Sequence, residues 1–307
     1  MRAPRVRAGM SGRPVLVSVV VPTHNREALL ADCLASLRRQ DYPPEAFEIV
    51  VVDDGSTDAT PAVVGRLLEG GPPAVRYLRQ EARGPNAARN AGIRLAGGDP
   101  ICLIDDDVEA PPGWLGALVQ GLLRHPEAGA AGGRIRLRLE GRAPRRCGRE
   151  PWVGEAEFDP APGEQVVREV ISANMAIRRW ALRAVGGFDE SLPLYGDEIE
   201  WQRRLGAAGH PIVYVPTAAL WHRRAADDLR KARLLRRYVR RGAGHVALAR
   251  RLGDRVSAGA ALRRLVLSLA HAVRRGCFLG LLVGAQQAGI LLALTRERLG
   301  RGRRTPP

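Results

Sequence analysis

Short, almost wholly apolar runs alternate with amphipathic stretches along the first hundred residues. The apolar runs lie at 15–21, 48–52, 75–78 and 101–104, and helical spacing of apolar residues follows at 29–37, 60–69 and 86–96. Apolar strands separated by helices are typical of a parallel sheet that is covered on both faces. The pattern therefore predicts an α/β fold that binds its ligand beyond the carboxyl ends of the strands.

The second half of the chain has a weaker periodicity. Residues 134–169 are rich in Gly, Pro and Arg, and they predict an irregular, partly mobile segment. Beyond this segment the pattern predicts further strands at 170–177 and 211–215, and helices at 179–185 and 197–208. We therefore expect a mixed, mainly parallel sheet flanked by helices.

Charge is distributed very unevenly over the 307 residues. The chain has 48 Lys and Arg against 32 Asp and Glu, but residues 223–307 alone hold 21 basic and 4 acidic residues, a net charge of +17. The first 222 residues are nearly neutral, at −1. An apolar fraction of 45% excludes disordered, collagen-like and polytopic membrane classes. The excess of basic residues in the tail therefore gives information about the binding partner of the tail, and little information about the fold.

The tail combines a basic helical stretch at 230–251 with an apolar stretch at 277–294 that has Arg on both sides. This combination predicts a helix or helical hairpin lying on an anionic membrane surface. The alternative is a helix packed on the rest of the protein with Arg facing solvent. No aromatic platform accompanies the Arg residues, so no nucleic-acid partner is expected.

Neither the N-terminal residues nor the cysteines indicate secretion. Residues 1–14 have charge but no apolar stretch of signal-peptide length, and they predict a disordered arm. The four cysteines, Cys33, Cys102, Cys147 and Cys277, are far apart and predict reduced thiols in a cytosolic protein. With the basic tail, this predicts a cytoplasmic protein that is peripheral at the inner face of the cell membrane.

Three adjacent carboxylates, Asp105 to Asp107, end the apolar run at 101–104. Adjacent carboxylates repel one another unless a cation compensates them. Asp105 and Asp107 are two residues apart and can point the same way, so they are candidate ligands of Mg²⁺ or Mn²⁺ beside substrate phosphates. A solvated acidic turn is the alternative.

Two more polar clusters end apolar runs. Asp53 and Asp54 can accept hydrogen bonds from a base or a ribose, or serve only to begin the next helix. In the cluster Pro22, Thr23, Asn25 and Arg26, Thr23 can bond a base or ribose and Arg26 can reach a phosphate; a simple turn is the alternative. Further along, Arg89 and Asn90 are expected to face the nucleotide from the helix at 86–96, unless that helix is merely amphipathic.

Taken together, these motifs resemble the family-2 glycosyltransferases, which have the Rossmann-like GT-A fold. The resemblance is carried by seven motifs in order: VSVVVPTHNRE, EIVVVDDGSTDAT, GPNAARNAGI, ICLIDDDVEAPPGWL, SANMAIRR, VGGFDESL and GDEIEWQRRLGAAGHPIVYVP. It covers roughly Val15 to His222. It implies a GT-A domain at 15–222, with a nucleotide-sugar half at 15–110 and an acceptor half at 111–222, followed by a basic helical tail at 223–307.

The resemblance also implies roles for individual residues. Asp53 and Asp54 correspond to the loop that holds the nucleoside, and Asp105 and Asp107 to the metal-binding D-x-D motif. Asp106 lies near the ribose or the donor sugar.

The remaining implied roles lie in the acceptor half. Glu198 occupies the position of the catalytic base, with Asp197 as the alternative, and Asp189 is a candidate for acceptor or donor contacts. His222 corresponds to a histidine that completes the metal shell in some GT-A enzymes; a histidine that only caps a strand is the alternative.

The implied activity is inverting transfer of a sugar from a nucleotide-diphosphate donor to an acceptor hydroxyl of a glycan or a lipid-linked glycan. One base and one displacement at the anomeric carbon give inversion. A related nucleotidyltransferase is disfavoured, because PTHNRE stands where such enzymes have a Gly-rich loop. A non-catalytic membrane- or nucleic-acid-binding adaptor is disfavoured because Asp53, Asp105, Asp107 and Glu198 are all present.

Overall fold

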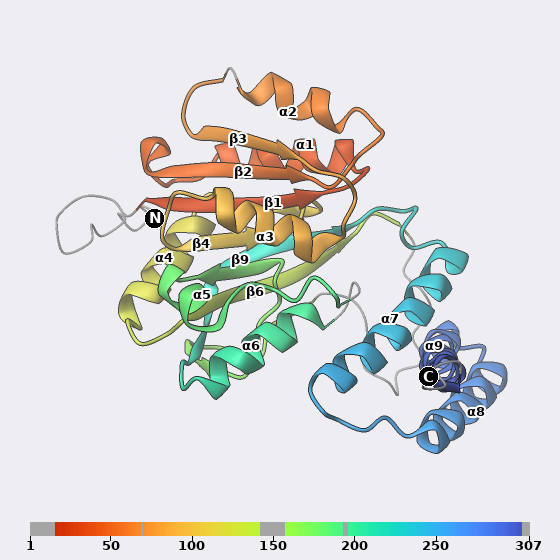
Figure 1. The fold of residues 1–307 in the computed structure, drawn as a ribbon. Coiled ribbons are helices and arrows are strands. Elements are labelled where there is room, and N and C mark those ends of the chain that lie inside the picture. The colour runs from red at the N-terminus through yellow and green to blue at the C-terminus, as the bar shows by residue number, and fades with distance from the viewer. Residues whose placement is uncertain (1–15, 69, 142–156, 193–195, 303–307) are drawn as a thin grey trace. The chain divides into compact units, whose positions relative to one another are not determined.

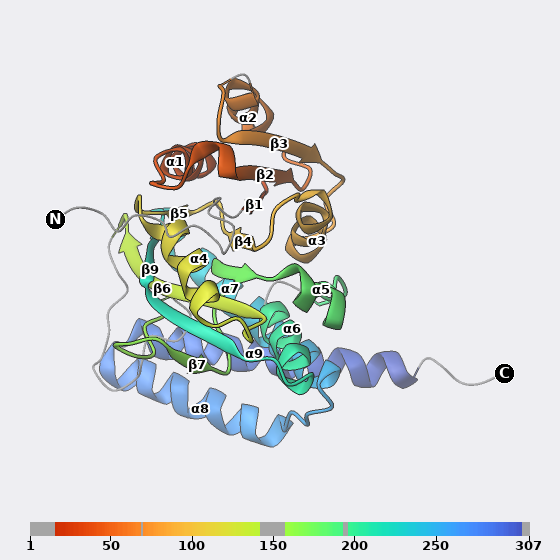
Figure 2. The same cartoon turned by 90° about the vertical axis from the view of Figure 1, so that its left-hand side faces the viewer.

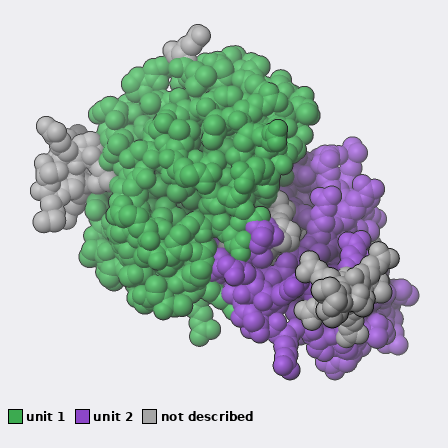
Figure 3. Space-filling view, in the orientation of Figure 1, with its two compact units in different colours: residues 1–138, 156–190, 201–223 green, residues 139–155, 191–200, 224–307 purple. Residues whose placement is uncertain are grey.

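The computed structural model describes residues 16–68, 70–141, 157–192 and 196–302, so the predicted arm at 1–14 lies outside the described residues. The chain forms two compact units (Figure 3). The first comprises residues 1–138, 156–190 and 201–223, and the second comprises residues 139–155, 191–200 and 224–307.

Four parallel strands form one half of the sheet in the first unit (Figure 1). They are β1 (Val17–Thr23), β2 (Phe47–Asp53), β3 (Ala74–Arg79) and β4 (Ile101–Ile104), which confirms the four predicted strands. Thr23 pairs with Asp53, and Asp53 with Arg79. The polar side chains that follow these strands therefore meet at one edge of the sheet.

Helices cover both faces of this sheet. They are α1 (Glu27–Arg38), α2 (Thr60–Leu68) and α3 (Pro85–Leu95). A short 3₁₀ turn at Pro44–Ala46 lies between α1 and β2. Figure 2 shows α1 and α3 on opposite sides of the sheet. Leu30, Leu34 and Leu37 of α1 belong to one apolar core, and Ala88 and Ala91 of α3 belong to the other.

The sheet has nine strands within the described residues, and their order is β3-β2-β1-β4-β8-β6-β9-β5, with β7 paired to β9. The elements not yet given are β5 (Val108–Glu109), α4 (Trp114–Arg124), β6 (Ala130–Leu139), β7 (Gln165–Val167), β8 (Asn174–Ile177), α5 (Arg179–Val185), α6 (Asp197–Ala207) and β9 (Ile212–Arg224). The strand β8 is antiparallel to both β4 and β6. The fold is therefore the mixed α/β GT-A fold that we expected.

One expectation from the sequence is wrong at both ends of the segment 134–169, because the strand β7 also lies within it. Residues 134–139 are not irregular but complete the ten-residue strand β6. Its Ile135, Leu137 and Leu139 alternate with arginines, and this period of two is the signal of a strand with one buried face. The part of the segment at 142–156 lies outside the described residues.

Two further strands differ in length from the prediction. The strand expected at 170–177 begins only at Asn174, because the chain turns just before it and the Asn174 amide donates to the Ile171 carbonyl. The strand expected at 211–215 extends to Arg224, so that His222 lies within β9 rather than after it. The buried residues Ala218, Leu220 and His222 all lie on one face of β9, as strand alternation requires.

A buried amide joins the two halves of the sheet. The Asn174 side chain accepts a hydrogen bond from the Trp114 indole at 2.8 Å and donates to the carbonyls of Ala218 and Arg134. A buried amide with all these partners is stabilising, whereas the same amide without them would be costly. Asn174 therefore fixes β8 against α4, β6 and β9.

The second unit consists mainly of three long helices. They are α7 (Lys231–Arg251), α8 (Ala258–Arg275) and α9 (Phe278–Gly302). The backbones of α7 and α9 approach so closely that a Cβ atom on Gly289 would lie 2.1 Å from the Val239 carbonyl oxygen. The apolar stretch predicted at 277–294 thus forms one continuous helix that packs on its neighbours.

Among the described residues, α9 is the helix that is long and apolar enough to cross a membrane. Residues Phe278–Glu297 have a mean hydropathy of 1.7, and 39% of the most apolar window is buried inside the protein. Core helices of globular proteins reach the same length and composition.

Candidate functional site

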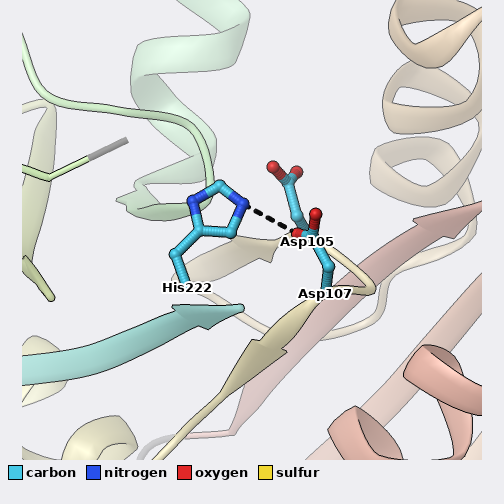
Figure 4. A group of neighbouring side chains, drawn as sticks. All are labelled: Asp105, Asp107 and His222. Atoms are coloured by element: carbon cyan, nitrogen blue, oxygen red, sulfur yellow. Dashed lines mark ion pairs between the residues drawn. The ribbon is translucent and has the colours of Figure 1, made fainter. Parts of the chain in front are cut away.

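The acidic cluster follows β4 at the carboxyl edge of the parallel strands. Figure 4 shows the side chains of Asp105, Asp107 and His222 beside one another. Their ligand atoms all lie within 4.8 Å of each other. The Asp107 side chain is 3% exposed, whereas the Asp105 side chain is 29% exposed. The cluster is therefore buried on one side and open on the other.

The position of His222 follows from strand pairing. Val108 of β5 pairs with His222 of β9. This pairing places the imidazole next to Asp107, which directly precedes Val108. The His222 Nε2 atom lies 2.8 Å from Asp107 Oδ1, and the histidine side chain is 4% exposed. The structure thus brings His222 to the D-x-D motif.

Arg26 balances part of the negative charge of the cluster. Its guanidinium donates to Asp107 Oδ2 at 2.8 Å and to Asp106 Oδ1 at 3.1 Å. The Thr23 hydroxyl donates to the other Asp106 oxygen at 2.7 Å. Burial raises the pKa of Asp106 to about 7, against the opposing effect of Arg26. In this structure Arg26 and Thr23 therefore contact the acidic cluster.

Asp105 has a different basic neighbour. Arg89 of α3 lies with one guanidinium nitrogen 3.5 Å from Asp105 Oδ1, and it donates a hydrogen bond to the Asn86 side chain at 3.2 Å. Both Arg89 and Asn86 are buried. The helix α3 thus places Arg89 beside Asp105, and the contact of Arg89 with a nucleotide stays a prediction.

Asp53 is fully buried at the end of β2. Its carboxylate accepts hydrogen bonds from the Tyr77 hydroxyl and the Ser56 amide, both at 2.7 Å, and Arg79 lies 3.7 Å away. Burial and the bond to Asp53 raise the pKa of Tyr77. Asp53 therefore organises the loop that follows β2, and its contact with a nucleoside stays a prediction.

Asp54 is held by the loop after β3. Its Oδ1 atom accepts from the Gln80 side chain at 2.7 Å and from the Arg83 amide at 2.9 Å, and its Oδ2 atom accepts from the Gly84 amide at 2.8 Å. Residues 80–83 are not among the site residues predicted from the sequence, and Gly84 is named only as the first residue of the motif GPNAARNAGI. Their signal was available, because they too follow a parallel strand and must lie at the same edge of the sheet.

Asn25 joins the loops after β1 and β2. It has a left-handed backbone with φ of 53°, a conformation that asparagine tolerates better than most residues. Its side-chain carbonyl accepts a hydrogen bond from the backbone amide of Thr57 at 2.7 Å. The backbone amide of Asn25 donates a hydrogen bond to the Ser56 hydroxyl at 2.9 Å. Pro22 lies within β1 and pairs with Val52.

Asn90 and Asp189 lie where α3 meets the loop after α5. The Asn90 side chain accepts from the Phe188 amide and donates to the Phe188 carbonyl, and the Asp189 carbonyl accepts from Asn86. The Asn90 amide thus holds the loop. Donor binding by Asn90 and acceptor contacts by Asp189 stay predictions.

The predicted base lies in the first turn of α6. Glu198 is half-buried, and residues 191–200 belong to the second unit, whereas the acidic cluster belongs to the first. Its role as a base therefore stays a prediction. Asp197 begins the helix, and its side chain lies outside the described residues.

The donor atoms of the cluster fit a divalent cation. Two carboxylates and one imidazole nitrogen converge within 4.8 Å, and carboxylate oxygens are the ligands that Mg²⁺ and Mn²⁺ prefer. The acidic cluster ends a buried strand at the edge where open α/β sheets bind ligands. Fold and site together define a GT-A protein with a candidate metal centre.

Comparison with known proteins places the chain more closely. The family model described as Glycosyl transferase family 2 matches residues 18–186, which is more than half of the chain. The chain therefore belongs to glycosyl transferase family 2.

Three similar proteins illustrate this relationship. Validoxylamine A glucosyltransferase of Streptomyces hygroscopicus subsp. limoneus is 33% identical over 240 residues, covering 66% of this chain and 51% of the relative. GalNAc(5)-diNAcBac-PP-undecaprenol beta-1,3-glucosyltransferase of Campylobacter jejuni is 38% identical over 105 residues, covering 34% of this chain and 33% of the relative. The chain spans about half the length of the first of these relatives.

The third comparison is with a solved structure. The mannosyltransferase PcManGT from Pyrobaculum calidifontis, in complex with GDP-Man and Mn²⁺, superposes with a TM-score of 0.62. The match covers 94% of this chain and 88% of that chain at 21% sequence identity, and it shows that the two share a fold.

Proposed function

We propose that this protein transfers a sugar from a nucleotide-diphosphate donor to an acceptor hydroxyl, with inversion at the anomeric carbon. The observation that carries the proposal is the convergence of Asp105, Asp107 and His222 at the carboxyl edge of the sheet, in a chain of glycosyl transferase family 2. The relatives named above are glycosyltransferases, which supports the same class of reaction.

Asp105, Asp107 and His222 would hold Mg²⁺ or Mn²⁺. When bound, the ion supplies positive charge beside the diphosphate, where negative charge develops as the donor bond breaks. The mannosyltransferase of similar fold is a complex with Mn²⁺, which supports a divalent cation here. Arg26 and Arg89, which lie against the same carboxylates, add further positive charge for the phosphates.

The nucleoside side of the donor is assigned to the loops after β1, β2 and β3. Asp53 and Asp54 are held in place by these loops, and Asp106 is fixed by Thr23 and Arg26. Rigid carboxylates of this kind can accept hydrogen bonds from a ribose or a base without a large entropic cost. We include Pro22, Asn25 and Asn90 in the donor site as residues that shape these loops.

Glu198 is assigned as the general base, with Asp197 as the alternative. The carboxylate takes the proton of the acceptor hydroxyl, the acceptor oxygen forms a bond to the anomeric carbon, and the bond from that carbon to the diphosphate oxygen breaks on the opposite face. The nucleoside diphosphate leaves with the electron pair. Asp189 is assigned to acceptor or donor contacts.

The segment that carries Glu198 is held by residues of its own unit. Glu200 has a side chain only 4% exposed, and its carboxylate lies 3.8 Å from Arg251 at the end of α7. A Cβ atom on Gly196 would lie 2.5 Å from the Leu248 side chain, so the turn before α6 packs directly on α7. These contacts support α7 as the element that positions the base.

We assign a glycan or a lipid-linked glycan as the acceptor. The Campylobacter relative is named for an acceptor linked to undecaprenol, and the basic helices of the second unit support a place at the inner face of the cell membrane. The enzyme is then cytoplasmic and peripheral.

The decisive experiment is a donor screen with purified protein. UDP-, GDP- and dTDP-sugars are tested with Mn²⁺, with Mg²⁺ and with chelator, by thermal shift and by release of the nucleoside diphosphate. We expect one donor to raise the melting temperature and to be hydrolysed slowly only with metal, since a ligand of the native state stabilises it. If no donor binds or turns over with any cation, the proposal is wrong.

The base assignment has its own test. Glu198→Gln should abolish sugar transfer and leave the donor-induced thermal shift unchanged, because the amide cannot accept the proton. Asp197→Asn is the matched variant and should retain transfer. Near wild-type transfer by Glu198→Gln together with loss in Asp197→Asn would move the base to Asp197.

A further inference from the structure

The helix α8 exposes an unusual amount of apolar side chain. Within the described residues, five of the eleven exposed large apolar side chains belong to this one helix: Leu262, Val266, Leu267, Leu269 and Val273, of which Val273 is 83% exposed. Apolar side chains scattered singly on a surface need no explanation, but a group on one helix marks an interaction site.

Four of these side chains form a continuous stripe. Leu262, Val266, Leu269 and Val273 follow one another at steps of four, three and four residues, which keeps them on one side of a helix. The buried residues of α8 are Ala261, Ser268 and Ala272, on a different side. Most of the stripe therefore lies on another side of α8 than the residues that are buried inside the unit.

The face packed inside the unit is already occupied by α9. A Cβ atom on Gly280 of α9 would lie 2.8 Å from the Ser268 carbonyl and 3.1 Å from the Ala272 Cβ. The helix α9 also borders the stripe at Leu269, whose Cδ2 atom would lie 3.3 Å from a Cβ atom on Gly284. The side chains of Leu262, Val266 and Val273 nevertheless remain more than half exposed. Some other apolar medium must cover them if they are to be removed from water.

The charges of α8 indicate which medium this is. The helix has four arginines, Arg263, Arg264, Arg274 and Arg275, and no acidic residue. Arg263 and Arg274 adjoin Leu262 and Val273 in the sequence, at the two ends of the stripe. Arginines of this kind can extend along an apolar surface and keep their guanidinium groups at the level of anionic headgroups.

A second copy of the chain fits this surface poorly. Residues 223–307 have a net charge of +17, so two tails packed through α8 would bring like charges together. An anionic lipid surface matches both the apolar stripe and the arginines beside it.

We infer that α8 lies in the interface of an anionic membrane, with Leu262, Val266, Leu269 and Val273 among the acyl chains and its arginines at the headgroups. This deepens the proposed peripheral location by naming the contact helix, and it transfers the contact from the apolar stretch at 277–294 to α8. The long helix α9 supports α8 from inside the unit and does not itself cross the bilayer.

The test is flotation of the full chain with lipid vesicles, without donor or acceptor. We expect the protein to float with vesicles of phosphatidylglycerol and phosphatidylcholine, and to float less with phosphatidylcholine alone. The triple variant L262Q/V266Q/V273Q should lose flotation by at least about tenfold, because the loss of one apolar side chain from an acyl environment is worth about tenfold or more. Leu68→Gln with Val166→Gln, exposed apolar residues of the first unit, is the matched control and should float like the wild type.

Further variants separate α8 from α9. Leu281→Gln with Leu292→Gln removes the exposed apolar residues of α9 and should leave flotation unchanged, and alkaline carbonate should extract the wild-type protein from the vesicles. Equal flotation of wild type and triple variant, or resistance to carbonate, would overturn the inference. So would a wild-type protein that stays in solution as a dimer and becomes a monomer in the triple variant.

Folding and sugar transfer are followed separately. The triple substitution changes exposed residues, and circular dichroism should show unchanged helix content. Because flotation needs no donor, failure of the membrane inference leaves the proposed transfer intact, and failure of the donor screen leaves flotation unaffected.

Discussion

At the scale of single residues, the acidic cluster shows how closely positive and negative groups are matched. Asp107 has His222 on one carboxylate oxygen and Arg26 on the other, each at 2.8 Å. If Asp107 binds the metal ion as we propose, these contacts set the orientation of its carboxylate in advance. The same carboxylate is almost wholly removed from water, so the loss of either neighbour should affect the properties of Asp107.

His222→Ala should weaken Mn²⁺ binding by at least about tenfold, because it removes one of three donor atoms and a contact that orients Asp107. Electron paramagnetic resonance of free Mn²⁺ during titration measures this directly. The control is His125→Ala, which replaces a partly exposed histidine near Glu127 and Glu164. This variant should bind Mn²⁺ like the wild type. Unchanged binding by His222→Ala would remove His222 from the metal site.

Glu164 provides a pH-dependent prediction away from the site. Hydrogen bonds from Arg124 lower its pKa below the ordinary value of 4.5, against the effect of burial. A lowered pKa means that the pair stabilises the fold above pH 4.5 and that this contribution is lost as the pH falls through the folded-state pKa.

The matching variant is Glu164→Gln. It should be less stable than the wild type at pH 7 by under about 1 kcal/mol, since the pair is partly exposed. Urea unfolding at pH 7 and at pH 3 measures the difference, which should shrink at pH 3. A difference that grows with acidity would contradict the assignment.

At the scale of elements, local sequence predicts the first half of the sheet well. Runs such as 49–52 and 101–104 are apolar throughout, which is typical of a strand buried on both faces. The sequence signal of β6 is different, because arginines alternate with apolar residues at 134–139. The Gly, Pro and Arg content of the longer segment 134–169 led us to expect an irregular segment there.

Part of the candidate site is predicted from the sequence, because the carboxyl ends of parallel strands lie at one edge of the sheet. Asp105 and Asp107 are found in this way, and the resemblance to a family adds His222. The hydrogen bonds that Asp54 receives from residues 80–84, and those between Asn90 and the Phe188 backbone, depend on tertiary contacts. The strand order places residues 80–84 at this edge of the sheet, but no local pattern shows which groups bond to Asp54 or Asn90.

The contact between α7 and α9 leads to a stability prediction. Gly289→Ala should destabilise the second unit by about 1–3 kcal/mol, because the new methyl group would lie 2.1 Å from the Val239 carbonyl oxygen and the helices would have to separate. Gly206→Ala, in α6 with no neighbouring atom within 4 Å, should instead stabilise by about 0.5–1 kcal/mol. Calorimetry of both variants gives the comparison, and equal effects would argue against close packing of α7 on α9.

At the scale of the whole molecule, the chain enters the second unit three times. Residues 191–200 group with the helices of the tail rather than with the sheet, and the strand β9, which carries His222, ends at Arg224, where the tail begins. The proposed base therefore lies in the same unit as the tail, and one proposed metal ligand lies directly before the tail in the sequence. If Glu198 is the base, the tail contributes to the arrangement of the proposed site.

Arg251→Met tests this view. It removes an ion-pair partner of the buried Glu200 carboxylate while keeping an unbranched apolar side chain. We expect a lower kcat and an unchanged KM for the donor, because the substitution disturbs the base segment and not the donor loops. Arg255→Met, a neighbouring arginine after α7, is the control; equal effects of the two variants on kcat would exclude a positioning role for Arg251.

The stripe on α8 also has a practical consequence for anyone who prepares this protein. A strongly cationic surface beside exposed leucine and valine side chains retains nucleic acid and anionic lipid from the host cell, and it promotes precipitation in dilute buffer. Purification is therefore best carried out at high ionic strength with a mild detergent, and an absorbance ratio should be checked for nucleic acid before any nucleotide-sugar titration is interpreted.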